Sequence, residues 1–201
     1  MQASSSTTIV LLAGGHATRF PGKLSHVVGD QPLLVRVFRA LATSGRPILI
    51  SAREPLPATL AEQLPVPVVL DAHGDVGPLG ALASTAAVVQ TPLLFAVAGD
   101  LANIGAGVID ELERRYHEER GRDRPLDAVL PRHESGEVEP LAALYDTLRL
   151  RERSAQLLSS GQTKVTALLQ EWDVAYVDVP RTRADEFLNV NHENDLAGIR
   201  R

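Results

Sequence analysis

The sequence contains no cysteine, only two lysines (Lys23 and Lys164) and no long apolar run. Without Cys there are no disulfides, no thiolate metal sites and no Cys nucleophile. No apolar run reaches the ~18 residues that a membrane span requires. The first six residues also lack the charged and apolar parts of a signal peptide, so a cytoplasmic location is the expectation.

An excess of positive charge is lacking as well. Lys and Arg number 20 against 25 Asp and Glu, which gives a formal net charge of −5. Nucleic-acid-binding proteins normally carry a basic stripe, so this balance argues against that class. The 201 residues, 44% of them hydrophobic, suffice for a globular core. Since no linker divides them, we predict one domain over residues 1–201, with a disordered head over residues 1–6.

Apolar segments of strand length alternate with helical patterns along the chain. Residues 7–13 are almost wholly apolar and β-branched, which is typical of a strand buried on both faces of a parallel sheet. Further strands are predicted at 47–51, 66–70, 93–98, 128–130, 141–145 and 174–179, and helices at 32–43, 57–64, 79–89, 107–119, 147–158, 163–171 and 193–199. This alternation predicts an α/β fold of three α/β/α layers with a mixed, mostly parallel sheet.

The loop over residues 12–23 (LAGGHATRFPGK) follows the first predicted strand. In open α/β sheets ligands bind outside the carboxyl ends of the strands. Gly14 and Gly15 allow the backbone to approach a ligand closely, and exposed N–H groups in such a loop bind phosphate. Arg19 and Lys23 add positive charge. We therefore interpret the loop as a phosphate site rather than as an ordinary glycine-rich connection.

Two better-known phosphate loops do not match. A Walker loop needs Gly six residues before its Lys and Ser or Thr after it, but Ala17 and Leu24 occupy those positions. The dinucleotide fingerprint GxGxxG does not occur in the loop.

Two carboxylates follow later strands. Asp71 precedes Gly77 and Pro78, where Pro is suited to begin a helix. Asp100 follows the apolar run 93–98, where a carboxylate is placed to hold a hard cation such as Mg²⁺. Each Asp could instead form a turn or cap a helix. Together with the Lys23 loop, Asp100 is better interpreted as a metal ligand, whereas the pair His73 and Asp75 is too weak a pattern for one.

Taken in order, these segments resemble the molybdenum cofactor guanylyltransferases, within the wider nucleotidyltransferases that begin L-A-G/A-G-x-x-x-R-[MF]-G-x-x-K. The C-terminal stretch FLNVN resembles the F-x-N-V-N signature of that family. The matching residues are Leu12, Ala13, Gly14, Gly15, Arg19, Phe20, Lys23, Asp71, Gly77, Pro78, Leu79, Asp100 and Phe187 to Asn191.

The resemblance implies a Rossmann-like nucleotidyltransferase fold with a nucleotide-binding N-terminal half and an acceptor-binding C-terminal half. It implies transfer of GMP from GTP to the terminal phosphate of molybdopterin, or of its molybdenum form, with release of pyrophosphate and with Mg²⁺ as cofactor. The acceptor phosphate is already mostly dianionic at pH 7, because its second pKa is near ~6. No Ser, Cys or His nucleophile is therefore required.

The resemblance also implies roles for individual residues. The catalytic residues would be Lys23, Arg19 and Asp100, with Asp100 as the metal ligand. The acceptor would bind at Asn189 and Asn191. The nucleotide would bind at Leu12, Ala13, Gly14, Gly15, Lys23, Ser51, Asp71, Gly77 and Asp100.

The sequence departs from the family pattern at four places. They are Gly22 for a frequent Asp, Ser51 for a frequent Asn, Leu101-Ala102 for Thr or Met followed by Pro, and Gly161-Gln162-Thr163-Lys164 for G-x-R-R/S. Two alternatives therefore stay open. One is another nucleotidyltransferase that uses CTP or a sugar phosphate acceptor. The other is a nucleotide-binding regulatory protein without turnover.

Overall fold

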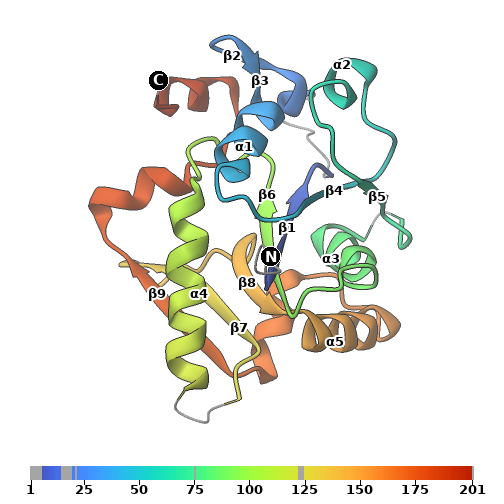
Figure 1. The fold of residues 1–201 in the computed structure, drawn as a ribbon, viewed down its shortest axis with the longest axis vertical. Coiled ribbons are helices and arrows are strands. Elements are labelled where there is room, and N and C mark those ends of the chain that lie inside the picture. The colour runs from blue at the N-terminus through green and yellow to red at the C-terminus, as the bar shows by residue number, and fades with distance from the viewer. Residues whose placement is uncertain (1–5, 15–19, 21, 75, 122–124, 201) are drawn as a thin grey trace.

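A seven-stranded mixed sheet forms the centre of the protein (Figure 1). The computed structural model describes residues 6–14, 20, 22–74, 76–121 and 125–200. The strand order is β5-β4-β1-β6-β8-β7-β9, and β8 runs antiparallel to both of its neighbours while the other pairs are parallel. The strands are β1 (Thr7–Leu12), β4 (Ile48–Ala52), β5 (Val68–Leu70), β6 (Leu93–Ala98), β7 (Ala128–His133), β8 (Ala142–Asp146) and β9 (Val174–Val179).

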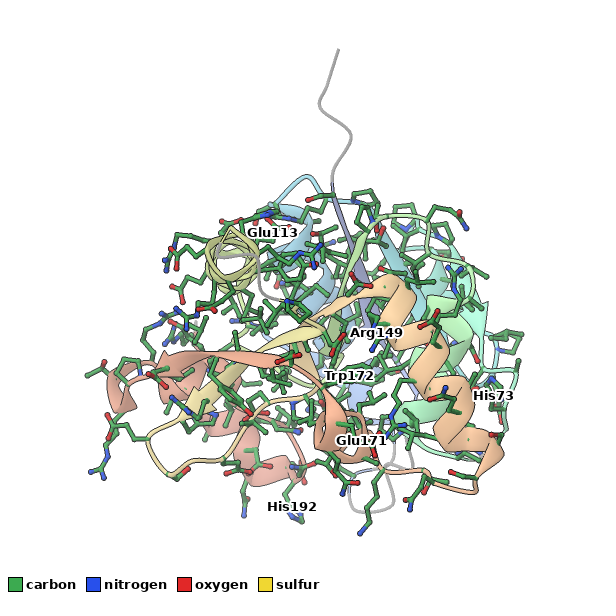
Figure 2. All side chains as sticks on the ribbon, turned by 90° about the horizontal axis from the view of Figure 1, so that it is seen from below. His73, Glu113, Arg149, Glu171, Trp172 and His192 are labelled. Carbon is green, nitrogen blue, oxygen red and sulfur yellow. The ribbon has the colours of Figure 1, made fainter. Side chains whose placement is uncertain are left out.

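Helices cover both faces of this sheet. One core packs α1 and α4 on one face, and a second core packs α3 and α5 on the other. Figure 2 shows the two layers through Glu113 of α4 and Arg149 of α5, which lie on opposite sides of the sheet. The α-helices are α1 (Leu33–Ala42), α2 (Ala58–Ala61), α3 (Pro78–Ala86), α4 (Ala106–Arg120) and α5 (Thr147–Ser159).

Strand β1 illustrates why the central strands are mostly apolar. Ile9 and Leu11 belong to the core beneath α1 and α4, while Val10 and Leu12 belong to the core beneath α3 and α5. Successive side chains of a strand point to opposite faces, so a strand covered by helices on both sides needs apolar residues at every position. All six residues of β1 are buried. The predicted three-layer α/β/α fold with a mostly parallel sheet is confirmed.

All seven predicted strands are present, and those at 93–98 and 174–179 have the predicted bounds. The segments predicted as helices at 163–171 and 193–199 form 3₁₀ rather than α-helices, η2 (Val165–Glu171) and η4 (Glu193–Gly198). Four elements were not predicted: two two-residue strands and a three-residue 3₁₀ segment, which are too short to show a period, and a seven-residue 3₁₀ segment. They are η1 (Lys23–Ser25), β2 (Val27–Val28), β3 (Gln31–Pro32) and η3 (Arg181–Phe187).

The predicted disordered head lies mostly outside the described residues. Ser6 is described, and its carbonyl accepts a hydrogen bond from the Leu93 N–H at 3.0 Å. Ser6 therefore extends the pairing of β1 with β6. Among the described residues, no helix combines the length and apolar character that a bilayer span requires.

Candidate active site

The four parallel strands β5, β4, β1 and β6 end at one edge of the sheet. The strand pairing places four residues side by side near this edge, one from each strand: Val69, Ser51, Leu12 and Ala98. The positions two residues further along each chain form a row, and in spatial order they are Asp71, Arg53, Gly14 and Asp100. Because neighbouring strands lie ~4.8 Å apart, this row spans roughly 14 Å.

A cavity of about 360 Å³ opens along this row. It is lined by Leu12, Gly14, Lys23, Leu24, Ser51, Ala52, Arg53, Asp71, Gly74, Gly77, Pro78, Ala81, Ala98, Asp100, Leu141 and Asn189. Eight of the residues assigned to the site from the sequence are among them. Two others, Ala13 and Asn191, do not line the cavity as described, and Gly15 and Arg19 lie outside the described residues.

At one end of the cavity, Asp71 is held by hydrogen bonds from its own segment. Its Oδ1 accepts the His73 N–H at 2.9 Å, and the Ser84 hydroxyl lies 3.0 Å away. That hydroxyl also lies 2.9 Å from the Gly80 carbonyl and accepts the Ala72 N–H at 3.0 Å. These bonds fix the carboxylate against α3. We call this part of the cavity the Asp71 end.

The predicted small-residue helix makes this contact possible. A Cβ added at Gly80 would lie 3.1 Å and 3.3 Å from the two carboxylate oxygens of Asp71, and 2.5 Å from Val76 Cγ2. A side chain at position 80 would therefore displace the carboxylate or the helix. The close packing of α3 thus sets the position of Asp71.

At the other end, Lys23 and Asp100 form an ion pair through Lys23 Nζ and Asp100 Oδ2. The same ammonium donates to the Val190 carbonyl at 2.9 Å. The two side chains are only 14% and 16% exposed. The loops after β1 and β6 and the C-terminal segment therefore meet at one ammonium group. We call this part of the cavity the Lys23 end.

Backbone pairing fastens the C-terminal segment to the loop after β6. The Val190 N–H donates to the Asp100 carbonyl, and the Ala102 N–H to the Leu188 carbonyl, both at 3.0 Å. Leu101 and Asn189 form an isolated antiparallel bridge. This pairing brings Asn189 into the wall of the cavity.

Gly99 allows the loop after β6 to pass so close to its neighbours. A Cβ at this position would lie 2.7 Å from Leu34 Cδ1 and 2.9 Å from the Leu12 carbonyl oxygen. Any larger residue would push Asp100 away from Lys23.

Two polar atoms at the cavity are buried and have no hydrogen-bond partner within the described part of the chain, namely Asp100 Oδ1 and the Ser51 hydroxyl. A buried polar atom without a partner is uncommon and is explained when a ligand, an ion or water completes its bonding. Oxygen is the ligand atom that Mg²⁺ takes, usually from one or two carboxylates together with substrate phosphates and water. Asp100 Oδ1 therefore fits a role as magnesium ligand, and Ser51 fits a contact to a polar ligand.

Of the pair His73 and Asp75, whose spacing was too weak a pattern for a metal site, only His73 is described. His73 is exposed and points away from the body of the protein in Figure 2, while Asp75 lies outside the described residues. Within the described part of the chain, His, Asp and Glu side chains form no cluster of three that could hold a metal on its own.

Asn191 is placed differently from Asn189, because it does not line the cavity. The N-cap of η4 is His192, which Figure 2 shows at the surface, so Asn191 does not cap this helix. The Asn191 and His192 N–H groups both donate to Asp195 Oδ2 at 2.7 Å, and these two bonds hold the pKa of Asp195 below its ordinary value. Asn191 is exposed, and its backbone stabilises the turn that follows Asn189.

Sequence reasoning missed two functional candidates, Arg53 and Ser84. Arg53 stands two residues after Ser51 and therefore on the same face of the extended chain, a signal that could have placed it at the cavity. Ser84 carried no such signal, because its contact with Asp71 spans 13 residues and depends on how α3 packs.

Comparisons with known proteins give a consistent result. The family model for the MobA-like NTP transferase domain matches residues 9–179. The chain is 27% identical to a probable molybdenum cofactor guanylyltransferase of Thermococcus gammatolerans, over 94% of this chain and 96% of that protein. It is 33% identical to a molybdenum cofactor guanylyltransferase of Bradyrhizobium sp., over 98% and 95%. Molybdopterin-guanine dinucleotide biosynthesis protein A from Archaeoglobus fulgidus has a similar structure, with a TM-score of 0.75 at 20% identity over 94% and 95% of the two chains.

Proposed function

Because the chain belongs to the MobA-like NTP transferase family, we propose that it transfers GMP from GTP to the terminal phosphate of a molybdopterin-type acceptor. The relatives named molybdenum cofactor guanylyltransferase match nearly the whole chain and support this reaction. The observation that carries the proposal is the Lys23 end, where a nearly buried cation and a carboxylate oxygen without a partner line one cavity.

The reaction joins two anions. An oxygen of the acceptor phosphate forms a bond to the α-phosphorus of GTP, and the bond from that phosphorus to the oxygen of the β-phosphate breaks, releasing pyrophosphate. The acceptor oxygen is already ionised at pH 7, so no side chain has to remove a proton from it. The protein must align the two phosphates and neutralise their charge.

Lys23 is suited to that neutralisation. Its ammonium already lies in the cavity, fixed by Asp100 and by the Val190 carbonyl. When the triphosphate binds, the phosphate oxygens replace these partners, and the ammonium then stabilises charge that develops as pyrophosphate leaves. A preorganised charge of this kind is worth a factor of ~10²–10³ in rate. The resemblance assigns a second cation, Arg19, to the same task.

Asp100 is the residue that would hold Mg²⁺. When bound, Mg²⁺ would supply positive charge that stabilises the phosphates and the leaving pyrophosphate. The Asp100 Oδ1 oxygen, which has no hydrogen-bond partner within the described residues, supports this role. Asn189, from the C-terminal segment, lines the same cavity as Asp100. Its side-chain amide offers both hydrogen-bond donors and an acceptor to the molybdopterin-type acceptor molecule.

A panel of nucleoside triphosphates, each with and without Mg²⁺, tests the proposal through the melting temperature. A ligand that binds only the folded state raises this temperature. We expect GTP with Mg²⁺ to raise it more than CTP, UTP or ATP, and the Mg²⁺ increment to vanish in Asp100→Asn. The matched control is Asp110→Asn, an exposed carboxylate on α4 outside the cavity.

Pyrophosphate release in the presence of a molybdopterin acceptor completes the test. Binding of GTP without release would favour a regulatory protein without turnover. A larger shift with CTP would favour a different nucleotidyltransferase. Equal shifts with all four nucleotides would refute the guanine assignment, and a GTP shift that ignores Mg²⁺ would refute the metal role of Asp100.

A further inference from the structure

Arg53 occupies the row at the sheet edge between Asp71 and Gly14. It lines the cavity directly after β4. A Cβ placed on Gly14 would lie 3.4 Å from Arg53 Cγ, so the aliphatic part of Arg53 lies across the bare backbone of Gly14. The side chain of Arg53 therefore forms part of the wall next to Asp71, and neither the motif nor the family resemblance assigned it a role.

The charged groups at the Lys23 end determine which part of a bound nucleotide lies next to Arg53. This step rests on the proposed function. The triphosphate belongs at the Lys23 end, where the ammonium and the unpartnered carboxylate oxygen lie. The remainder of the row, roughly 14 Å in all from three strand spacings, then receives the nucleoside. The small residues Gly14, Gly77 and Ala81 line the cavity and leave room for a flat ring between Arg53 and Asp71.

Guanine is the base whose edges complement this pair of side chains. An ionised Asp only accepts hydrogen bonds, and an Arg only donates them. Guanine carries N–H donors at N1 and N2 beside acceptors at O6 and N7, and Arg bonds to O6 and N7 as a two-pronged donor. Adenine presents an amino donor at position 6, which would face the donors of Arg.

We propose that Arg53 is a specificity-determining residue that donates to O6 and N7 of guanine, while Asp71 accepts from N1–H and the 2-amino group. The fixed carboxylate at the Asp71 end sets the position of the base, and Arg53 distinguishes guanine from adenine. Arg53 acts on the choice of nucleotide and not on the transfer step.

The test pairs a change in the protein with a change in the ligand. Binding of GTP and of 7-deaza-GTP, which has a C–H in place of N7, is measured by calorimetry with Mg²⁺ for the wild type and for Arg53→Met. Methionine keeps a flexible apolar stem over Gly14 but has no donor. Arg53→Lys keeps the positive charge but lacks the guanidinium group that donates two hydrogen bonds side by side. The control Arg114→Met removes an exposed arginine on α4, outside the cavity.

We expect the wild type and Arg114→Met to bind GTP roughly tenfold or more better than 7-deaza-GTP. In Arg53→Met this preference disappears, because both ligands lose the bond to O6 and GTP also loses the bond to N7, and in Arg53→Lys it shrinks. The melting temperature without ligand is measured for every variant, so that a change in nucleotide preference is distinguished from a change in stability. Loss of the preference with an unchanged fold is an effect that a purely structural role of Arg53 would not produce.

Two results would overturn the inference. One is a preference for GTP over 7-deaza-GTP that persists in Arg53→Met. The other is equal binding of both ligands by the wild type. If instead the wild type binds no nucleotide, or binds ATP and CTP as tightly as GTP, then the proposed function itself fails, and the two failures are told apart by the wild-type data alone.

Discussion

The two ends of the cavity are built in different ways. At the Asp71 end, the bonds that hold the carboxylate come from one continuous segment, and the longest of them joins residues 13 positions apart. At the Lys23 end, the ammonium joins residues 77 and 167 positions away along the chain. One end is a local structure and the other a junction of distant segments.

This difference separates binding from catalysis. The hydrogen bonds that hold Asp71 come from the chain itself, so under the proposed function the carboxylate is already positioned before a base binds. At the Lys23 end the charge of Lys23 is balanced by Asp100, and in the proposed reaction this pair would exchange partners when the phosphates and Mg²⁺ bind. Changes at the Asp71 end should therefore affect nucleotide affinity, and changes at the Lys23 end should affect the rate of transfer.

The largest effect is expected for Lys23→Ala. The variant loses a preorganised charge at the phosphates, so GMP transfer slows by roughly 10²-fold or more. The free energy of unfolding falls by about 1–3 kcal/mol, because Asp100 and the Val190 carbonyl lose a partner. Steady-state rates together with denaturant unfolding measure both quantities.

Lys164→Ala is the control for Lys23→Ala, because it removes the other lysine of the chain, an exposed one. It should keep the full rate. A Lys23→Ala protein that also keeps the full rate would remove Lys23 from the mechanism, and one that unfolds would assign it to stability alone.

Asn189→Ala should give the next largest effect, a several-fold to tenfold rise in the KM for the acceptor or fall in kcat, with GTP affinity nearly unchanged. Asn189 lines the cavity beside Asp100, and its amide can bond to the acceptor. Asn191→Ala is the internal control, since the Asn191 backbone N–H and not its side chain is bound to Asp195. If the two substitutions changed the acceptor kinetics equally, the proposed contact between the Asn189 side chain and the acceptor would be refuted.

Ser84→Ala tests the Asp71 end. Asp71 loses one of the two hydrogen bonds that position Oδ1, so we expect the KM for GTP to rise about threefold to tenfold, as for one neutral hydrogen bond, while kcat stays the same. Thr85→Ala is the matched control, because the Thr85 hydroxyl bonds only to α3 carbonyls. A fall in kcat without a change in KM would break the division between the two ends.

Ser51→Ala should have the smallest effect. The buried Ser51 hydroxyl has no partner among the described residues, so its removal leaves no other group unpaired, and the free energy of unfolding should stay the same or rise slightly. GTP affinity should fall only a few-fold. Ser51→Asn, which restores the amide common in the family, should not weaken GTP. A marked loss of stability in Ser51→Ala would show that the hydroxyl serves the fold.

Much of the fold could be predicted from the sequence because its pattern is local. The central strands are almost wholly apolar, and glycine or polar residues lie within two positions of the end of each. Even the bounds of β6 and β9 follow from such runs. The short elements around residues 23–32 and 181–187 could not be predicted, because their conformation depends on tertiary contacts such as the Leu33 N–H donating to the His26 carbonyl.

The candidate site shows the same limit. The positions of Lys23, Asp71 and Asp100 at strand ends placed them at one edge of the sheet. Their partners Val190 and Ser84 could not be predicted, because a backbone carbonyl is the same in every residue and a helical Ser has no distinctive pattern. The order of the strands, which puts Arg53 between Asp71 and Gly14, also could not be predicted from the sequence.

The sequence by itself determined the layers of the fold, the apolar strands and the polar residues that leave them, since these depend on periods of two and of 3.6 residues within short segments. Tertiary structure alone decided that the C-terminal segment pairs with the loop after β6, that Lys23 is bound by both, and that α3 packs close enough to hold Asp71. Those contacts join residues far apart in the chain, and their geometry arises only when the whole sheet has formed.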